Sequence, residues 1–272
     1  MISKENSAES EFTDTDVLQR RSDSQDLESP LKIHYEDNHH LVVEKMPNLL
    51  SQGDITGRDD VLTLMKAYLV ERENKPGEAW LAAVHRLDYP VGGLMLLAKT
   101  SKAASRLAAQ MREHRIERLY LCVVEGKTLP EGTLEHWLLK DRDKNITRAV
   151  PANTPQAKYA SLRYWLIATQ EDKSLVLVKL GTGRSHQIRV QFREAGHPLL
   201  GDRRYGDNVK RGVYPKDKDG LALFACGLSW EHVTLKEARR VMAYPSTEHW
   251  LSWQSYESQV FQRMENLFEQ GS

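Results

Sequence analysis

The chain has 272 residues, 40% hydrophobic and 28% charged, a composition that can fill a sizeable core and excludes global disorder. No apolar run approaches the ~20 residues that span a bilayer, no secretory signal opens the chain, and two cysteines are too few for a disulfide framework. The 38 basic and 38 acidic side chains cancel, but residues 1–30 hold three basic and eight acidic groups, which leaves the centre basic. We therefore expect a soluble, cytoplasmic protein whose central region either attracts a polyanion or is an ordinary mixed surface.

The two ends of the chain differ in character from its body. Residues 1–30 are rich in Ser, Asp and Glu and predict a disordered tail. Residues 31–45 predict a β-hairpin with its turn at 36–39, and the apolar spacing of residues 61–71 predicts a helix. The Trp and apolar residues of segment 246–272 predict an amphipathic C-terminal helix that packs on the body.

A loop between two short apolar runs, within residues 83–98, holds a group of reactive side chains. His85, Arg86 and Asp88 lie in it, and Thr100 or Ser101 can cap the helix that follows. A guanidinium beside an aspartate favours the ionised carboxylate, which can act as a nucleophile or a base. A purely structural Asp–Arg pair explains the same residues.

The second half of the chain predicts strands at 119–124, 161–167 and 175–180, and loops with short strands over 127–157. No HExxH pair, phosphate-binding glycine loop or dinucleotide fingerprint occurs, so zinc hydrolysis, nucleotide hydrolysis and hydride transfer lack a site.

A short helix is expected over 186–195, with Ser185 as its N-cap and Gly196 just past its end. Arg189 and Arg193 then share a face opposite the apolar one. Such a basic stripe can contact phosphates, or it can simply face solvent.

Four motifs resemble those of the RluA-type pseudouridine synthases and occur in the family's order. They are His-Arg-Leu-Asp at 85–88 with Gly93, the strand motif at 118–126, the Gly-Arg-Ser-His-Gln-Ile-Arg run at 183–189 with Gly-His-Pro at 196–198, and Gly-Asp at 201–202 with Tyr-Gly at 205–206. Residues 33–45 also resemble the opening strand pair of that family. At 91–92, Val-Gly replaces the usual Thr-Ser, so the two hydroxyl groups of the family's loop are lost here.

The resemblance implies an α/β (α+β) catalytic domain over 31–245, with a mixed, mostly antiparallel central sheet flanked by helices and loops. It implies isomerisation of uridines in RNA (rRNA or tRNA) to pseudouridine after base flipping, with neither a metal nor an organic cofactor. An S4 RNA-binding module, common in relatives, is not expected in the first thirty residues. We expect a monomer that binds RNA and no membrane.

The resemblance also implies roles for individual residues. Asp88 matches the essential aspartate, which either adds at the sugar C1′ or removes the 2′ proton. Tyr120 matches the tyrosine that stacks on the base, and Arg184 the basic residue that pairs with the carboxylate. Arg86 resembles the arginine that fills the space left by the flipped uridine. Further RNA contacts are expected from His85, Arg189, Arg193 and Lys99.

Two other functions stay open. A non-catalytic RNA-binding or RNA-chaperone protein could retain the same fold, and the altered 91–92 positions are compatible with it. A glycoside or nucleoside hydrolase would need a second carboxylic acid, which the sequence does not identify.

Overall fold

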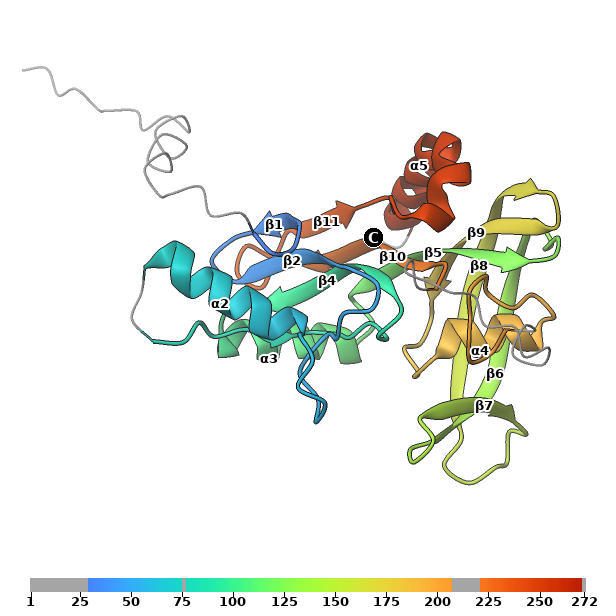
Figure 1. Cartoon of the computed structure of the whole chain (residues 1–272), viewed down its shortest axis with the longest axis horizontal. Helices are drawn as coiled ribbons and strands as arrows, with labels where there is room; N and C mark the ends of the chain where they lie inside the picture. The colour runs from blue at the N-terminus through green and yellow to red at the C-terminus, as the bar shows by residue number, and fades with distance from the viewer. Residues whose placement is uncertain (1–28, 75–76, 207–220, 271–272) are drawn as a thin grey trace, which may run out of the picture.

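The computed structural model describes residues 29–74, 77–206 and 221–270 (Figure 1). The disordered tail predicted over 1–30 therefore lies, except for its last two residues, outside the described residues. The described residues form one mixed sheet of eleven strands. In chain order the strands are β1 (Ile33–Glu36), β2 (His40–Lys45), β3 (Ala82–Ala83), β4 (Gly92–Ala98), β5 (Glu117–Glu125), β6 (Glu131–Asp141), β7 (Ile146–Val150), β8 (Lys158–Gln170), β9 (Lys173–Leu180), β10 (Leu223–Glu231) and β11 (Ala238–Met242).

The order of strands in the sheet differs from their order in the chain, because a strand from near the C-terminus lies between two from the N-terminal half. The path runs β1-β2-β4-β10-β5-β9-β8-β6-β7, with β3 paired to β4 and β11 to β10. Among the described strands only β4 and β10 pair in parallel, and every other pair is antiparallel. The predicted mixed, mostly antiparallel sheet is thus confirmed, and β10 separates β4 from β5.

Helices cover both faces of the sheet. The helices α2 (Val61–Glu73) and α4 (Gln187–Glu194) pack on one face, while α3 (Ser101–Arg112) and α5 (Glu257–Glu269) pack on the other (Figure 1). Successive residues of a strand point to opposite faces, so Leu94 joins the core under α3 while Met95 joins the core under α2. Central strands are consequently buried on both sides, which explains why β4 and β5 read as unbroken apolar runs.

Capping residues set the helix starts. Asp60 accepts hydrogen bonds from the backbone of Leu62 and Thr63 at the start of α2, and the Thr100 hydroxyl accepts from Ala103 at the start of α3. The hairpin predicted over 31–45 and the helix predicted over 61–71 are both confirmed.

The start of α4 differs from the prediction. Its N-cap is His186 rather than Ser185, in a left-handed conformation with φ of 54°, and no side chain caps it. The end agrees: Gly196 has φ of 82°, its N–H donates to Arg193 O, and His197 N–H donates to Phe192 O. This pair of bonds is the Schellman motif that a glycine past the helix end predicts.

Two segments carry more regular structure than their sequence indicates. Residues 127–157 form the long strand β6 and its partner β7 rather than loops with short strands. The C-terminal segment begins with a 3₁₀ helix, η2 (Glu248–Tyr256), before α5, and Trp250, Trp253 and Val260 are buried. In the described parts of the chain, no helix has the length and apolar character that crossing a membrane requires.

A glycine fixes how closely β4 approaches β10. Gly93 has φ of +117°, and a Cβ there would lie 2.4 Å from the backbone nitrogen of Ala225. No L side chain fits this position without moving one of the two strands. Gly93 therefore sets the course of the chain directly after the loop that carries Asp88.

Candidate active site

The loop that carries Asp88 enters the N-terminal end of β4 and is held from several sides. The Ser51 hydroxyl donates to Leu87 O at 2.7 Å and accepts from Leu87 N–H at 3.0 Å. The backbone N–H of Val91 donates to Asp88 O at 3.0 Å, which closes a turn. These bonds fix the backbone of Asp88 before any side chain of the site is considered.

Lys45 is a positioning residue that the sequence did not reveal. It is fully buried, and its ammonium donates to the carbonyls of Met46, Leu49 and Tyr89 at 3.0, 2.8 and 3.1 Å. Burial lowers the pKa of Lys45 to about 7, while the charge of Asp88 opposes this shift. Three carbonyl acceptors match the three N–H groups of an ammonium, so this side chain ties the opening hairpin to the Asp88 loop.

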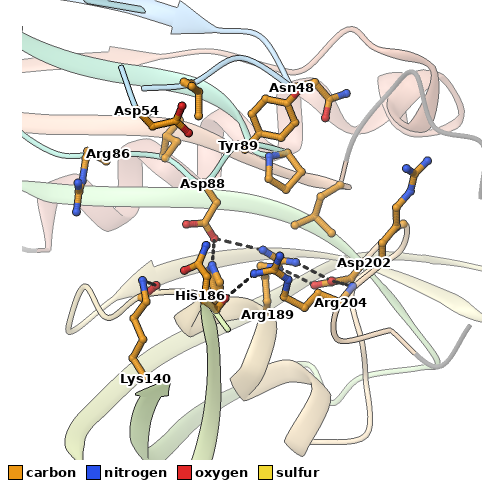
Figure 2. A pocket seen from close by; sticks show the side chains of 18 of the residues that line it. Asn48, Asp54, Arg86, Asp88, Tyr89, Lys140, His186, Arg189, Asp202 and Arg204 are labelled. Atoms are coloured by element: carbon orange, nitrogen blue, oxygen red, sulfur yellow. Dashed lines mark hydrogen bonds and ion pairs between the residues drawn. The ribbon is translucent and has the colours of Figure 1, made fainter. Parts of the chain in front are cut away.

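The Asp88 carboxylate lies between a guanidinium and an imidazole (Figure 2). Its Oδ2 is 3.4 Å from Arg189 Nη1 and 3.7 Å from His186 Nε2, and 31% of its side chain is exposed. Both contacts are long for hydrogen bonds, so the carboxylate keeps oxygen lone pairs available.

Arg189 is itself held by a second carboxylate. Its Nε and Nη2 donate to the two oxygens of Asp202 at 2.7 and 2.8 Å, a bidentate pair in which Asp202 is buried. Burial opposes ionisation of Asp202, but the hydrogen bonds and charge of Arg189 outweigh it and lower the pKa of Asp202. With one carboxylate neutralised in this way, Arg189 presents Nη1 to Asp88.

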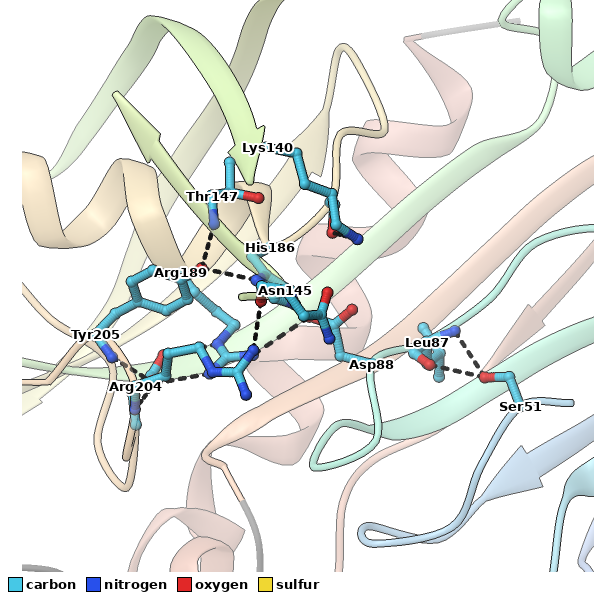
Figure 3. Close-up of polar contacts among 12 residues, drawn as sticks. Ser51, Leu87, Asp88, Lys140, Asn145, Thr147, His186, Arg189, Arg204 and Tyr205 are labelled. Carbon is cyan, nitrogen blue, oxygen red and sulfur yellow. Dashed lines mark hydrogen bonds and ion pairs between the residues drawn. The ribbon is translucent and has the colours of Figure 1, made fainter. Parts of the chain in front are cut away.

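His186 is oriented by a chain of hydrogen bonds (Figure 3). The Tyr205 hydroxyl oxygen accepts from Thr147 N–H at 2.8 Å and lies 2.7 Å from His186 Nδ1. The Tyr205 proton then has His186 Nδ1 as its acceptor, which leaves the imidazole proton on Nε2, facing Asp88. Burial lowers the pKa of His186 to about 4, against the charge of Asp88, so the ring is neutral at pH 7.

Two hollows meet at Asp88. The larger is an open cleft of about 610 Å³ lined by exposed basic side chains, among them Arg58, Lys140 and Arg204. The smaller is a recess of about 90 Å³ that Asp88 shares with Tyr120 and Arg118. A wide polar cleft joined to a small, partly apolar recess can hold a charged polymer with one planar group inserted.

Tyr120 forms part of the recess wall. It is 6% exposed, and burial raises the pKa of its hydroxyl, with the charge of Arg118 acting in the opposite direction. The apolar side chains of Val91, Leu180 and Ile188 line the same recess. The structure therefore brings together the two residues, Asp88 and Tyr120, that lie 32 positions apart in the sequence.

The expected pairing of Arg184 with Asp88 needs correction. Arg184 lines the recess but is exposed, and its Nε donates to Tyr159 O at 2.9 Å. Arg189, five residues later, is the guanidinium beside Asp88. The helical turn between them explains the error, because the turn at His186 carries Arg184 outward and Arg189 inward.

The structure separates the two arginines of the predicted basic stripe on α4. Arg189 is buried between Asp88 and Asp202, so it cannot contact phosphates from a solvent-facing surface. Arg193 is exposed and lies outside both hollows. The sequence could not show this, because Asp202 reaches Arg189 from a loop beyond the helix.

Two further residues expected to contact RNA lie away from the cleft surface. His85 is buried, its Nε2 accepts from Leu96 N–H, and burial lowers its pKa to about 3. Lys99 pairs with Glu36 at 2.6 Å, at the end of β4 opposite to Asp88. Seven residues of strand place these two ends ~20 Å apart. Arg86, by contrast, is exposed and lines both hollows (Figure 2).

Among the described residues, one group of three side chains is of the kinds that bind metal ions. It lies at the end of β4 remote from Asp88. Asp37, His40 and His232 have potential ligand atoms within 4.8 Å of one another. His232 Nδ1 accepts from the backbone of Thr234 and Leu235, so its proton lies on Nε2 and donates to Asp37 at 2.9 Å. A metal at Nε2 would force a proton onto Nδ1, against two N–H donors, so this cluster fits a hydrogen-bond network better than a metal.

Comparisons with known proteins identify relatives of this chain. Residues 39–194 match the family model described as RNA pseudouridylate synthase. The chain is 34% identical over 203 residues to a ribosomal large subunit pseudouridine synthase D of Zymomonas mobilis, covering 73% of this chain and 63% of that protein. It is 35% identical over 179 residues to an uncharacterized RNA pseudouridine synthase of Bacillus subtilis, covering 65% of this chain and 61% of that one.

The chain thus spans about three fifths of the length of these curated relatives. Among solved structures, human RNA pseudouridylate synthase domain containing 1 superposes with a TM-score of 0.64 at 23% identity, over 80% of this chain and 84% of the human chain. That likeness confirms the fold. The family match over more than half of its length shows that the chain belongs to the RNA pseudouridylate synthase family.

Proposed function

We propose that this protein isomerises uridine in RNA to pseudouridine, with Asp88 as the catalytic carboxylate. The observation that supports this most directly is the position of Asp88, at the junction of a basic cleft and a recess walled by Tyr120. An RNA strand in the cleft can place one flipped nucleotide in the recess, with its ribose next to the carboxylate.

The free energy gained by stacking in the recess offsets much of the cost of extruding the nucleotide. Extruding a nucleotide from a stack costs a few kcal/mol, and stacking on an aromatic ring returns ~1–3 kcal/mol. Arg86, exposed at the mouth of both hollows, is suited to fill the space that the nucleotide leaves. Exposed cations along the cleft supply the phosphate contacts that dominate affinity for RNA.

Asp88 acts either by adding to C1′ or by removing the 2′ proton, and both routes need its carboxylate ionised. Arg189 and the neutral His186 place a positive charge and an N–H on one side of Oδ2. The apolar recess wall keeps water from the detached sugar, where it would convert isomerisation into hydrolysis. The names of the relatives favour ribosomal RNA of the large subunit over tRNA as substrate.

The test is tritium release from RNA that carries C5-labelled uridine. We expect release by the wild-type protein and none by Asp88→Asn, with RNA binding unchanged. Equal release by both proteins would contradict the role of Asp88, and binding without any release by the wild type would favour the non-catalytic RNA-binding protein.

A further inference from the structure

Arg118 lines the recess and has no role so far. It is on β5, two residues before Tyr120, so both side chains point to the same face of the sheet. It lines the recess together with Asp88. The charge of its guanidinium lowers the pKa of the Tyr120 hydroxyl, against the larger effect of burial, which raises it.

The charge of Arg118 is uncompensated within the described residues. Arg118 is half-buried, yet no carboxylate of residues 29–74, 77–206 or 221–270 forms an ion pair with it, and its buried Nε has no hydrogen-bond partner there. Arg189, in the same recess, has two carboxylates. A half-buried guanidinium without an opposing charge is costly, and such groups occur where a ligand completes the site.

Gly183 leaves room for the guanidinium of Arg118, because it has no side chain. A Cβ at residue 183 would lie 3.0 Å from both Nη1 and Nη2 of Arg118, closer than ordinary contact. The absence of a side chain at 183 thus lets the guanidinium of Arg118 lie against the backbone at the recess wall. Arg118 is therefore held in position by packing rather than by an acid.

The proposed reaction creates a negative charge in this recess. When the bond between C1′ and N1 breaks, the electron pair stays on uracil, and the resulting anion spreads its charge over N1 and the two carbonyl oxygens. C5 then bonds to C1′ while the bond from Asp88 to C1′ breaks or, on the other route, while Asp88 returns its proton to C2′. The C5 proton leaves to a base, and N1 takes up a proton from solvent. Atoms and electrons balance without a further reactant, and the charge on the base is greatest between the two bond changes.

We propose that Arg118 is a catalytic residue that stabilises the departing uracil anion by donating to one of its carbonyl oxygens. This inference rests on the proposed function. Asp88 then acts on the ribose and Arg118 on the uracil, the two groups that the breaking bond between C1′ and N1 joins. The stabilisation appears only while the base is anionic, which is the condition for lowering the barrier rather than tightening binding.

The surroundings favour a base over a phosphate as the partner of Arg118. Apolar side chains of Val91, Ile188 and Leu223 and the ring of Tyr120 line the recess, which suits a planar base. Exposed cations such as Arg58 and Lys140 line the wider cleft, where a phosphate keeps its water. A phosphate contact is therefore an outcome that the experiment can reveal, not the expectation.

The experiment measures single-turnover tritium release and RNA affinity for Arg118→Gln and Arg118→Lys. Loss of one preorganised donor to a developing anion typically lowers a rate constant by about 10²–10³-fold. We expect a loss of this size for Arg118→Gln with less than about a threefold change in affinity, and partial recovery in Arg118→Lys. Gly183→Ala keeps the charge but displaces the guanidinium, so its rate should fall between those of the wild type and Arg118→Gln.

Arg163→Gln is the matched control, because Arg163 is an exposed arginine on β8 that stacks on Trp165. It should behave as the wild type, and thermal unfolding of every variant checks that the fold is retained. A substrate with 5-fluorouridine at the target adds a second readout, since fluorine withdraws electrons and stabilises the departing anion. Consumption of this nucleotide should lose less rate in Arg118→Gln than conversion of uridine does.

The outcomes separate the two proposals. Wild-type release with an unchanged rate in Arg118→Gln overturns the role of Arg118 alone. Weaker RNA binding at an unchanged single-turnover rate also overturns it and assigns Arg118 to a phosphate. Equal rate losses for uridine and 5-fluorouridine contradict leaving-group stabilisation, and no release by the wild type removes both proposals.

Discussion

Asp37 and Asp88 both lie beside histidines, yet their surroundings differ in kind. The Asp37 carboxylate accepts five hydrogen bonds, from Tyr35 Oη at 2.7 Å, the backbone of His39 and His40 at 2.6 and 2.7 Å, His40 Nδ1 at 3.0 Å and His232 Nε2 at 2.9 Å. Burial opposes its ionisation, but these donors dominate and hold the pKa of Asp37 well below its usual range. Every lone pair of this carboxylate is engaged.

Asp88 has the same kinds of neighbour at greater distance. Its contacts with Arg189 and His186 are 3.4 and 3.7 Å long, and both involve the same oxygen. Arg189 gives its short bonds to Asp202 instead. A carboxylate saturated with donors holds a fold together, whereas one that is charged but under-coordinated can react.

The sharpest test of this contrast makes the same substitution at both aspartates. Asp88→Asn should reduce tritium release by at least about 10³-fold, because the amide neither adds to C1′ nor accepts the 2′ proton. The free energy of unfolding should change by less than about 1 kcal/mol, since no short hydrogen bond to this carboxylate is lost. Denaturant titration of the same preparation provides the second measurement.

Asp37→Asn should show the opposite pattern. An amide cannot accept from all five donors, so we expect a loss of about 2–4 kcal/mol in the free energy of unfolding. The single-turnover rate of the protein that stays folded should match the wild type. A large loss of rate at full folding would show that the comparison between the two aspartates is wrong.

Acid titration separates the two sites by their pH windows. The pKa of His186 is about 4 in the folded protein and ~6.5 when unfolded, so the unfolded chain binds more protons between these values. Stability is therefore lost as pH falls from ~6.5 towards 4, by up to about 1.4 kcal/mol per pH unit for this histidine. His186→Gln should reduce that slope in urea titrations at successive pH values.

Asp37 contributes in a lower window. Because its folded pKa is depressed, its stabilisation is complete above the unfolded value of ~3.9 and is lost only below that. Asp37→Asn should therefore reduce the pH dependence of the free energy of unfolding below about pH 4. Above that pH the dependence arises from the histidines and should be unchanged. An unchanged slope below pH 4 would contradict the network around Asp37.

The smallest expected effect concerns salt. Lys140 and Arg58 line the cleft at Asp88, so replacing either with Gln should reduce the slope of log affinity against log salt by ~0.7 for a single-stranded RNA contact. Arg193→Gln, outside the cleft, should leave the slope unchanged. A drop for Arg193→Gln alone would support the helix stripe predicted from sequence instead.

Local patterns predicted much of the fold. The hairpin at 31–45, the helix from residue 61 and Gly196 at the end of α4 follow from alternation, periodicity and backbone preference. The extent of β6 was missed because its inward-facing residues are mostly only partly buried and include Gly132 and His136, so the strand lacks a clear apolar alternation. Burial by a partner strand cannot be read from one segment alone.

The candidate site was predicted less completely, for a physical reason. Asp88 and Tyr120 are in recognisable motifs, whereas the pairing of Arg189 with Asp202 depends on how a loop returns over α4. The Asp37 network joins positions 195 residues apart. Charges on a helix face look exposed until a distant acid covers them, so helical spacing predicted a phosphate contact for Arg189. The pairing of Arg184 with Asp88 was implied by the resemblance, which did not show where either guanidinium lies.

The insertion of β10 between β4 and β5 has a consequence for synthesis on the ribosome. The chain completes β5 at residue 125, but β10 begins only at residue 223. At ~5–20 residues per second, a nascent chain keeps the edges of β4 and β5 open for about 5–20 s. Since open strand edges invite pairing with other chains, we expect newly made protein to depend on chaperones during this interval.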